Sequence, residues 1–182
     1  MNTRYNVDTK VVMEALSYYE SLGYELISVP MIVDKRSSDL TKPKDRKDLQ
    51  HLSGVYVASA EQSFIDMILK GDLKTGMYCA ITPCYRDEPT LDETHLNIFL
   101  KVELIAVHSC IPEVLLGDAK RFFSRYITGV EEVATEAGSD LEVNGVELGS
   151  YGYRVVEGHL ISYGTGLAEP RFSYVRGEHV EV

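Results

Sequence analysis

Hydrophobic and polar residues alternate most regularly in the segment 97–104. One face of this segment carries Ile98, Leu100, Val102 and Leu104, and the opposite face carries Asn97, Phe99, Lys101 and Glu103. A period of two residues predicts a β-strand with one face in the core. Phe99 stands alone among polar residues, which favours an aromatic platform in a solvated site. The alternative is a strand buried on both faces, with Phe99 in the core.

Apolar residues recur at helical spacing in three segments, at about 11–22, 60–69 and 112–137. Asp8 or Thr9 can cap the first helix and Ser59 the second, because their side-chain oxygens accept hydrogen bonds from free backbone N–H groups. A glycine follows the first and the third segment, as is typical of helix ends. The pattern therefore predicts two short helices and one long amphipathic helix.

The remaining pattern predicts strands, at about 24–30, 55–58, 77–85, 151–156 and 158–163, and a short helix from about Pro170. Asn144-Gly145 lies between two short strand-forming runs, 141–143 and 146–148, which is a strong signal of a type I′ hairpin. Because hairpins dominate the connections, we expect an α+β fold with a mainly antiparallel sheet flanked by helices.

Residues 34–50 are rich in Lys, Arg and Asp and poor in apolar side chains. Such a composition buries little surface and predicts a mobile surface loop. The functional alternative is a basic flap over a phosphate or an RNA.

Composition narrows the class of protein. The 182 residues carry a net charge of −10, which works against a general affinity for nucleic acid. Cys79, Cys84 and Cys110 are odd in number and lack metal-site spacing, so we expect reduced thiols. No signal-like N-terminus and no apolar stretch long enough for a membrane helix occur in the sequence. We therefore expect a cytoplasmic protein with no membrane partner.

Three segments, in order, resemble the signature motifs of class II aminoacyl-tRNA synthetases. The first helix with the run 23–30, which ends in a proline, resembles motif 1, the dimer interface of that family. Residues 85–103 resemble motif 2, from Tyr85-Arg86-Asp87-Glu88 through Asp92-Glu93-Thr94-His95 to Phe99 and Val102-Glu103. Their spacing is most similar to the phenylalanyl-tRNA synthetase branch. The run 164–171, Gly-Thr-Gly-Leu-Ala-Glu-Pro-Arg, resembles motif 3. The resemblance spans about residues 8–175.

The resemblance implies a ligase that uses ATP and Mg²⁺ to activate a small amino acid, or a similar carboxylate, as its adenylate. Arg86 would bridge the α-phosphate and the attacking carboxylate, and Arg171 would hold the γ-phosphate and lie over the adenine. The other implied ATP contacts are Phe99 stacked on the base, Glu88 on its amino group, His95 on the phosphates, and Gly164 and Gly166 close to the nucleotide. Glu147 and Ser150 would carry the magnesium ion. Glu61 would bind the substrate ammonium group.

Each candidate also has an ordinary structural explanation. Arg86 can pair with Asp87 at the surface, His95 can be a free loop residue, and Glu61 can be a first-turn carboxylate favoured by the helix dipole. Glu147 can be a solvated hairpin residue, and the glycines of 164–166 can serve a turn.

Only a short segment follows Arg171, so we expect one domain, 1–182, without an anticodon-binding domain. The acceptor of the activated amino acid stays open between a tRNA acceptor end and a carrier protein or other molecule. A noncatalytic paralogue that binds a nucleotide or a partner protein, as a regulatory or accessory subunit, is the alternative. In either case we expect a homodimer through residues 8–30.

Overall fold

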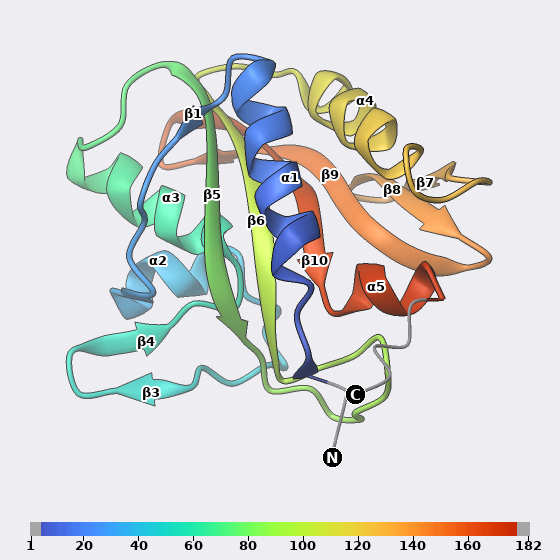
Figure 1. Cartoon of the computed structure of the whole chain (residues 1–182). Coiled ribbons are helices and arrows are strands. Elements are labelled where there is room, and N and C mark those ends of the chain that lie inside the picture. Colours follow the sequence, from blue (N-terminus) through green and yellow to red (C-terminus); the bar gives the residue numbers. More distant parts are fainter. Residues whose placement is uncertain (1–4, 178–182) are drawn as a thin grey trace.

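The structure is a computed structural model that describes residues 5–177, which form a large sheet, a small sheet and five helices (Figure 1). The large sheet has the strand order β1 (Glu25–Leu26), β5 (Gly76–Tyr85), β6 (Ile98–Val107), β10 (His159–Glu169), β9 (Val146–Val156), β8 (Gly138–Val143) and β7 (Glu131–Thr135). β1 runs parallel to β5, and the other neighbours are antiparallel. The predicted α+β fold with a mainly antiparallel sheet is confirmed.

Helices cover both faces of the large sheet. On one face, α1 (Thr9–Ser21), α4 (Pro112–Phe123) and α5 (Arg171–Val175) share an apolar core with Val102 and Leu104 of β6. On the other face, α3 (Ala60–Lys70) packs on Ile105 and Val107 of the same strand. Because successive side chains of a strand point to opposite faces, β6 contributes to both cores.

A small antiparallel sheet lies beside α3, in the order β2 (Ile32–Val33), β4 (Gly54–Tyr56) and β3 (Gln50–His51). The predicted strand at 24–30 is regular only at Glu25–Leu26, and the predicted strand at 55–58 is β4. No helix among residues 5–177 is long and apolar enough to cross a membrane.

Both predicted helix caps are present. The Asp8 carboxylate accepts hydrogen bonds from the backbone N–H groups of Lys10 and Val11, at 2.9 and 3.3 Å, and begins α1. The Ser59 hydroxyl accepts the N–H of Glu61 at 3.5 Å and begins α3. These side chains take up N–H groups that a helix start leaves without partners.

The predicted long helix at 112–137 is wrong. α4 ends at Phe123, and residues 131–135 form the exposed edge strand β7, which pairs with β8. Gly129 has a φ of 78°, a left-handed conformation that ends helical geometry. Tyr126, Ile127 and Val130 still pack against the core, so the apolar pattern continued while the backbone changed.

The predicted hairpin at Asn144-Gly145 is confirmed, with φ values of 51° and 78° as a type I′ turn requires. β9 is longer than expected, because it joins the predicted runs 146–148 and 151–156 into one strand. β10 continues through residues 164–166, where the pairing with β6 shifts register between Thr165 and Leu167.

The segment 34–50 is folded onto α3 rather than extended into solvent. It contains α2 (Lys35–Asp39), and the Ser37 hydroxyl donates to Asp66 of α3 at 2.8 Å. Asp48 accepts from Ser38 at 2.7 Å and forms an ion pair with Lys42. Polar contacts therefore order this segment, whose composition predicted a mobile surface loop.

Candidate active site

A cavity of about 350 Å³ opens on the α3 side of the large sheet, at the N-terminal end of α3. Its walls come from the segment 41–48, the start of α3, the end of β5, and the strands β6, β9 and β10. Five predicted site residues line it, and they are Glu61, Arg86, Glu88, Glu147 and Ser150. The remaining predicted residues lie outside the lining, and they are His95, Phe99, Gly164, Gly166 and Arg171.

Arg86 follows the last residue of β5, and its backbone N–H donates to the carbonyl of Asn97 at 2.8 Å. Its Nε donates to the carbonyl of Ala58 at 3.1 Å. The guanidinium carbon lies 4.8 Å from the centroid of the Phe99 ring, within cation–π distance. Arg86 forms no ion pair with any residue in 5–177, so its charge is not neutralised by a carboxylate.

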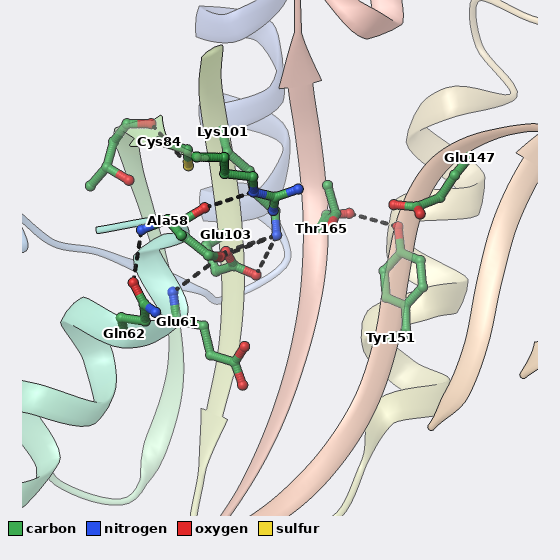
Figure 2. A network of polar contacts seen from close by, with 12 residues as sticks. Ala58, Glu61, Gln62, Cys84, Lys101, Glu103, Glu147, Tyr151 and Thr165 are labelled. Atoms are coloured by element: carbon green, nitrogen blue, oxygen red, sulfur yellow. Dashed lines mark hydrogen bonds and ion pairs between the residues drawn. The ribbon is translucent and has the colours of Figure 1, made fainter. Parts of the chain in front are cut away.

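A buried charged cluster of Ser59, Lys101 and Glu103 lines the same cavity as Arg86. Figure 2 shows Lys101 and Glu103 of this cluster. Lys101 Nζ lies 2.9 Å from one oxygen of Glu103 and donates to the Ser59 hydroxyl at 3.3 Å, and Ser59 also donates to Glu103. Glu103 is only 1% exposed, so its charge depends on these partners. The polar face of β6 is therefore part of the site, and the aromatic member of that face supports Arg86.

Glu61 extends from the first turn of α3 into the cavity region (Figure 2). Its Oε1 lies 2.6 Å from Nε of Arg154 on β9, as an ion pair whose orientation is not that of a hydrogen bond. Burial raises the pKa of Glu61 to about 7, against the opposing effect of Arg154, with a smaller upward contribution from Glu103. Glu61 is thus a carboxyl group that titrates near neutral pH.

Glu88 also lines the cavity, with a side chain that is only 13% exposed, and its Oε2 lies 3.4 Å from Nη1 of Arg46. Arg46 also donates to the carbonyl of Asp87 at 2.9 Å. The segment 41–48 therefore closes one side of the cavity through Arg46. Asp87 forms no ion pair with Arg86, so the structural alternative of a surface pair between these two residues is absent.

Arg171 begins α5, and its side chain reaches back towards the motif 2 loop. Its Nε donates to the carbonyl of Thr94 at 3.0 Å, and its Nη1 lies 3.3 Å from Oε1 of Glu147. Because Glu147 lines the cavity, this ion pair connects Arg171 to the cavity wall.

His95 lies in an exposed turn that Asp92 organises. One Asp92 oxygen accepts the backbone N–H groups of Thr94 and His95, each at 2.7 Å, and the His95 ring lies 3.0 Å from the other oxygen. These hydrogen bonds, those of Thr94 first, hold the pKa of Asp92 well below its usual range. The turn presents His95 to solvent beside Arg171's partner, Thr94.

The two glycines of the motif 3 run face the core rather than the cavity. A Cβ atom at Gly164 would lie 2.5 Å from the Tyr151 ring, and one at Gly166 would lie 2.8 Å from the Tyr19 ring. The missing side chains therefore make room for buried tyrosines. Thr165, between them, lines the cavity. The close approach to a nucleotide stays a prediction.

Glu147 and Ser150 both line the cavity, but they have protein partners. Ser150 donates to Asp140 at 2.5 Å, and Glu147 pairs with Arg171. No group of three or more His, Cys, Asp or Glu side chains in the described part of the chain is arranged to hold a metal ion. Magnesium usually binds through one or two carboxylates together with substrate phosphates and water, and the half-exposed Glu147 fits that habit.

Sequence reasoning did not identify several residues of the site, and they are Arg46, Ser59, Arg154, Tyr163 and Thr165. The strand pattern contained a signal for Lys101 and Glu103, since both share the polar face of 97–104. Arg154 carries no local motif. Only the pairing of β9 with β10 brings it over the Tyr163 ring, at 4.5 Å, and next to Glu61.

The chain was compared with protein-family models, curated proteins and solved structures. No protein-family model matches the chain, and no curated protein matches its sequence. Among solved structures, a pyrrolysyl-tRNA synthetase from Desulfitobacterium hafniense superposes with a TM-score of 0.71 and 17% identity, covering 93% of this chain and 66% of that one. A second structure of pyrrolysyl-tRNA synthetase from the same organism gives a TM-score of 0.70, with 69% of its chain covered.

A cytoplasmic serine-tRNA ligase from Naegleria fowleri, solved in complex with AMP, superposes with a TM-score of 0.69 and 16% identity. The alignment covers 91% of this chain and 46% of the ligase. The chain thus spans about two thirds or less of the length of these structures. It has the fold of a class II aminoacyl-tRNA synthetase catalytic domain.

Proposed function

We propose that the protein activates an amino acid, or a similar small carboxylate, with ATP to form an adenylate. The observation that carries this proposal is that Arg86, without a carboxylate partner among residues 5–177, lines the same cavity as Glu61. One group suits the anions of the reaction and the other suits a substrate ammonium. The likeness to synthetase structures supports the same class of chemistry.

In this reaction a carboxylate oxygen attacks the α-phosphorus of ATP and pyrophosphate leaves. Arg86 would hold the carboxylate and the α-phosphate together through its guanidinium group, and Glu61 would fix the ammonium group. The protein then contributes positioning and charge stabilisation rather than a covalent step. Magnesium would supply further neutralisation of phosphate charge, held by Glu147 with the Ser150 hydroxyl nearby.

The residues that would bind the adenine end of ATP are Phe99, Glu88 and Arg171. Phe99 already has one face near the Arg86 guanidinium, and Arg171 is joined to the cavity wall through Glu147. Glu88 would accept from the adenine amino group once Arg46 releases it. His95 would reach the phosphates from its exposed turn. Gly164 and Gly166 would contribute backbone near the nucleotide.

The acceptor of the activated group would be a tRNA acceptor end or a carrier protein. We further propose a cytoplasmic, single-domain protein that forms a homodimer through residues 8–30. Exposed apolar side chains along that segment support the dimer, and they are Met13, Leu22 and Leu26. Monomeric mass in light scattering at micromolar concentration would overturn it.

Exchange of labelled pyrophosphate into ATP, measured across the twenty amino acids, tests the proposed activity. Exchange that depends on an amino acid supports it, and the absence of exchange with every amino acid overturns it. Calorimetry with ATP alone separates loss of chemistry from loss of nucleotide binding.

The second candidate function is a noncatalytic paralogue that binds a nucleotide or a partner protein as a regulatory or accessory subunit. The shortness of α5, which has five residues, favours it. ATP binding without exchange, and unchanged behaviour of Arg86→Ala, would select this alternative.

A further inference from the structure

Nearly every residue that lines the cavity carries a polar group, and the apolar surface of the cavity comes from tyrosine rings, side-chain stems, Pro43 and Ala58. Its lining among residues 5–177 contains no Val, Leu, Ile, Met or Phe side chain. Apart from Pro43 and Ala58, each lining residue offers a hydroxyl, amide or charged group. Amino-acid pockets that select apolar side chains need apolar walls, because burial is favourable only when water is exchanged for an apolar surrounding.

Residues from the sheet provide the part of the cavity next to Glu61. Thr165 of β10 stands opposite Glu103 of β6 in the strand register, and Tyr163 precedes it on the same face. The Thr165 hydroxyl makes no hydrogen bond to another described residue and is therefore free for a ligand. Gly149 gives it space, since a Cβ atom there would lie 2.5 Å from the Thr165 Cβ.

The carboxylates in this part of the wall already have cations beside them. Glu61 pairs with Arg154, Glu103 pairs with Lys101, and Glu147 pairs with Arg171. A cationic substrate side chain would have to replace one of these partners. An anionic side chain would meet these carboxylates, and Arg86, a lining cation without a carboxylate partner among residues 5–177, is assigned to the α-phosphate and the substrate carboxylate. The wall therefore favours neither charge.

The volume of the cavity limits the size of the substrate side chain. About 350 Å³ lies near the lower end of the range of roughly 300–1,000 Å³ typical of ligand pockets, and a nucleotide needs part of that space. A bulky side chain has little room beside it.

We infer that the substrate is a small amino acid whose side chain is uncharged and hydrogen-bonding, carrying a hydroxyl or a carboxamide group. This inference rests on the proposed function, because it assigns the substrate class of the same site. A site built from hydrogen-bonding groups rejects an analogue that lacks them, because its buried polar atoms lose water without gaining a partner. The similarity of motif 2 to the phenylalanyl branch concerns contacts to ATP and does not oppose this class.

The test uses the full chain with a non-hydrolysable ATP analogue and four groups of amino acids. The neutral polar group is serine, threonine, asparagine and glutamine; the others are apolar, acidic and basic. Binding is measured by calorimetry, and kcat/KM by pyrophosphate exchange. We expect a member of the neutral polar group to exceed every apolar and charged amino acid by at least tenfold.

A matched pair of variants tests the role of the cavity wall. Thr165→Val keeps the shape and removes the free hydroxyl, and we expect at least a tenfold loss of kcat/KM for the preferred polar substrate with a smaller loss for valine. Thr82→Val makes the same change at a buried position in β5, which is separated from β10 by β6 and lies outside the cavity at this residue. We expect the preference of Thr82→Val to equal that of the unsubstituted protein.

Preferred binding or exchange of phenylalanine, leucine, valine or a charged amino acid would overturn the inference while leaving the proposed function in place. Binding of a neutral polar amino acid without exchange would support the inference and overturn the proposed activity. If no amino acid binds in the presence of the ATP analogue, both are overturned.

Discussion

Nε of Arg154 lies 2.6 Å from Oε1 of Glu61, so the carboxylate predicted to bind a substrate ammonium already has a cation beside it. The pair joins the end of one hairpin strand to the first turn of α3, across a distance of 93 positions in the sequence. Burial nevertheless raises the pKa of Glu61 to about 7, because the loss of water outweighs the attraction of Arg154. The charge on this group therefore changes within the physiological range.

We predict that amino-acid affinity rises with pH through about 7, since only the ionised form of Glu61 attracts an ammonium group. Below that pH the dissociation constant should increase about tenfold per unit. Glu61→Gln should weaken binding at pH 8 and remove the dependence. Arg154→Met should move the midpoint to higher pH, because Arg154 lowers the pKa of Glu61. Calorimetric titrations between pH 5.5 and 8.5 measure all three, and a midpoint that Arg154→Met leaves unchanged would contradict the assignment.

Glu169 predicts a pH dependence of stability rather than of binding. It is fully buried, and burial raises its pKa to about 7, against hydrogen bonds from Ser173 and from the backbone N–H of Asp8. The negative charge of Asp8 adds to the rise in pKa, and the positive charge of Arg176 opposes it. The native state therefore binds more protons than the unfolded chain between about pH 4.5 and 7, so the free energy of unfolding falls as pH rises through that window. The contribution is on the order of 3 kcal/mol at most.

Glu169→Gln imitates the protonated carboxyl, and we expect it to match the unsubstituted protein near pH 5 and to be more stable at pH 8. Urea unfolding at both values measures the difference. Glu131→Gln, on exposed β7, is the control and should leave the slope unchanged. Equal slopes for Glu169→Gln and the unsubstituted protein would show that Glu169 does not titrate as described.

The register shift in β10 frees two carbonyl groups that buried tyrosines satisfy. The Tyr19 hydroxyl donates to the Gly166 carbonyl at 2.8 Å, and the Tyr151 hydroxyl donates to the Thr165 carbonyl at 2.6 Å (Figure 2). Tyr19→Phe leaves a buried carbonyl without a partner, and we expect a loss of about 1–3 kcal/mol in the free energy of unfolding. Tyr153→Phe, at a half-exposed position of β9, should change it by less than about 0.5 kcal/mol.

The cluster of Ser59, Lys101 and Glu103 gives a prediction about a buried ion pair. Glu103→Ala leaves the Lys101 ammonium, whose side chain is 12% exposed, without its carboxylate, and we expect a loss of about 3–5 kcal/mol in the free energy of unfolding. Replacing both members, as Lys101→Met with Glu103→Leu, should recover much of that loss. A double variant as unstable as Glu103→Ala would mean that packing, rather than charge, sets the cost.

Local patterns predicted the parts of the fold that depend on local physics. The alternation at 97–104, the cap at Asp8 and the Asn144-Gly145 turn each follow from a few neighbouring residues, and each is present. The helix over 112–137 failed because apolar spacing continued past Gly129, where the backbone left the helical region. Helical spacing alone does not distinguish a helix from a chain that returns to the same core.

The site likewise contains residues that local motifs predicted and residues that only tertiary contacts bring in. The motif residues Arg86, Glu61, Glu88 and Glu147 lie on one cavity, although contacts far apart in sequence define its walls. Arg46 reaches Glu88 from a segment whose composition predicted a mobile loop, and Arg154 reaches Glu61 only through strand pairing. Such partners depend on tertiary register, which a single sequence does not encode in any local pattern.

Amino-acid-dependent exchange of pyrophosphate into ATP, compared between the unsubstituted protein and Arg86→Ala, tests the central proposal most directly. We predict exchange with a neutral polar amino acid, and a loss of at least 100-fold in Arg86→Ala, because that arginine would stabilise charge in the transition state. Arg125→Ala, which removes a guanidinium over the Tyr18 ring on the α1 and α4 side, should retain the rate. Exchange that Arg86→Ala leaves intact, or its absence with every amino acid, would contradict the proposal.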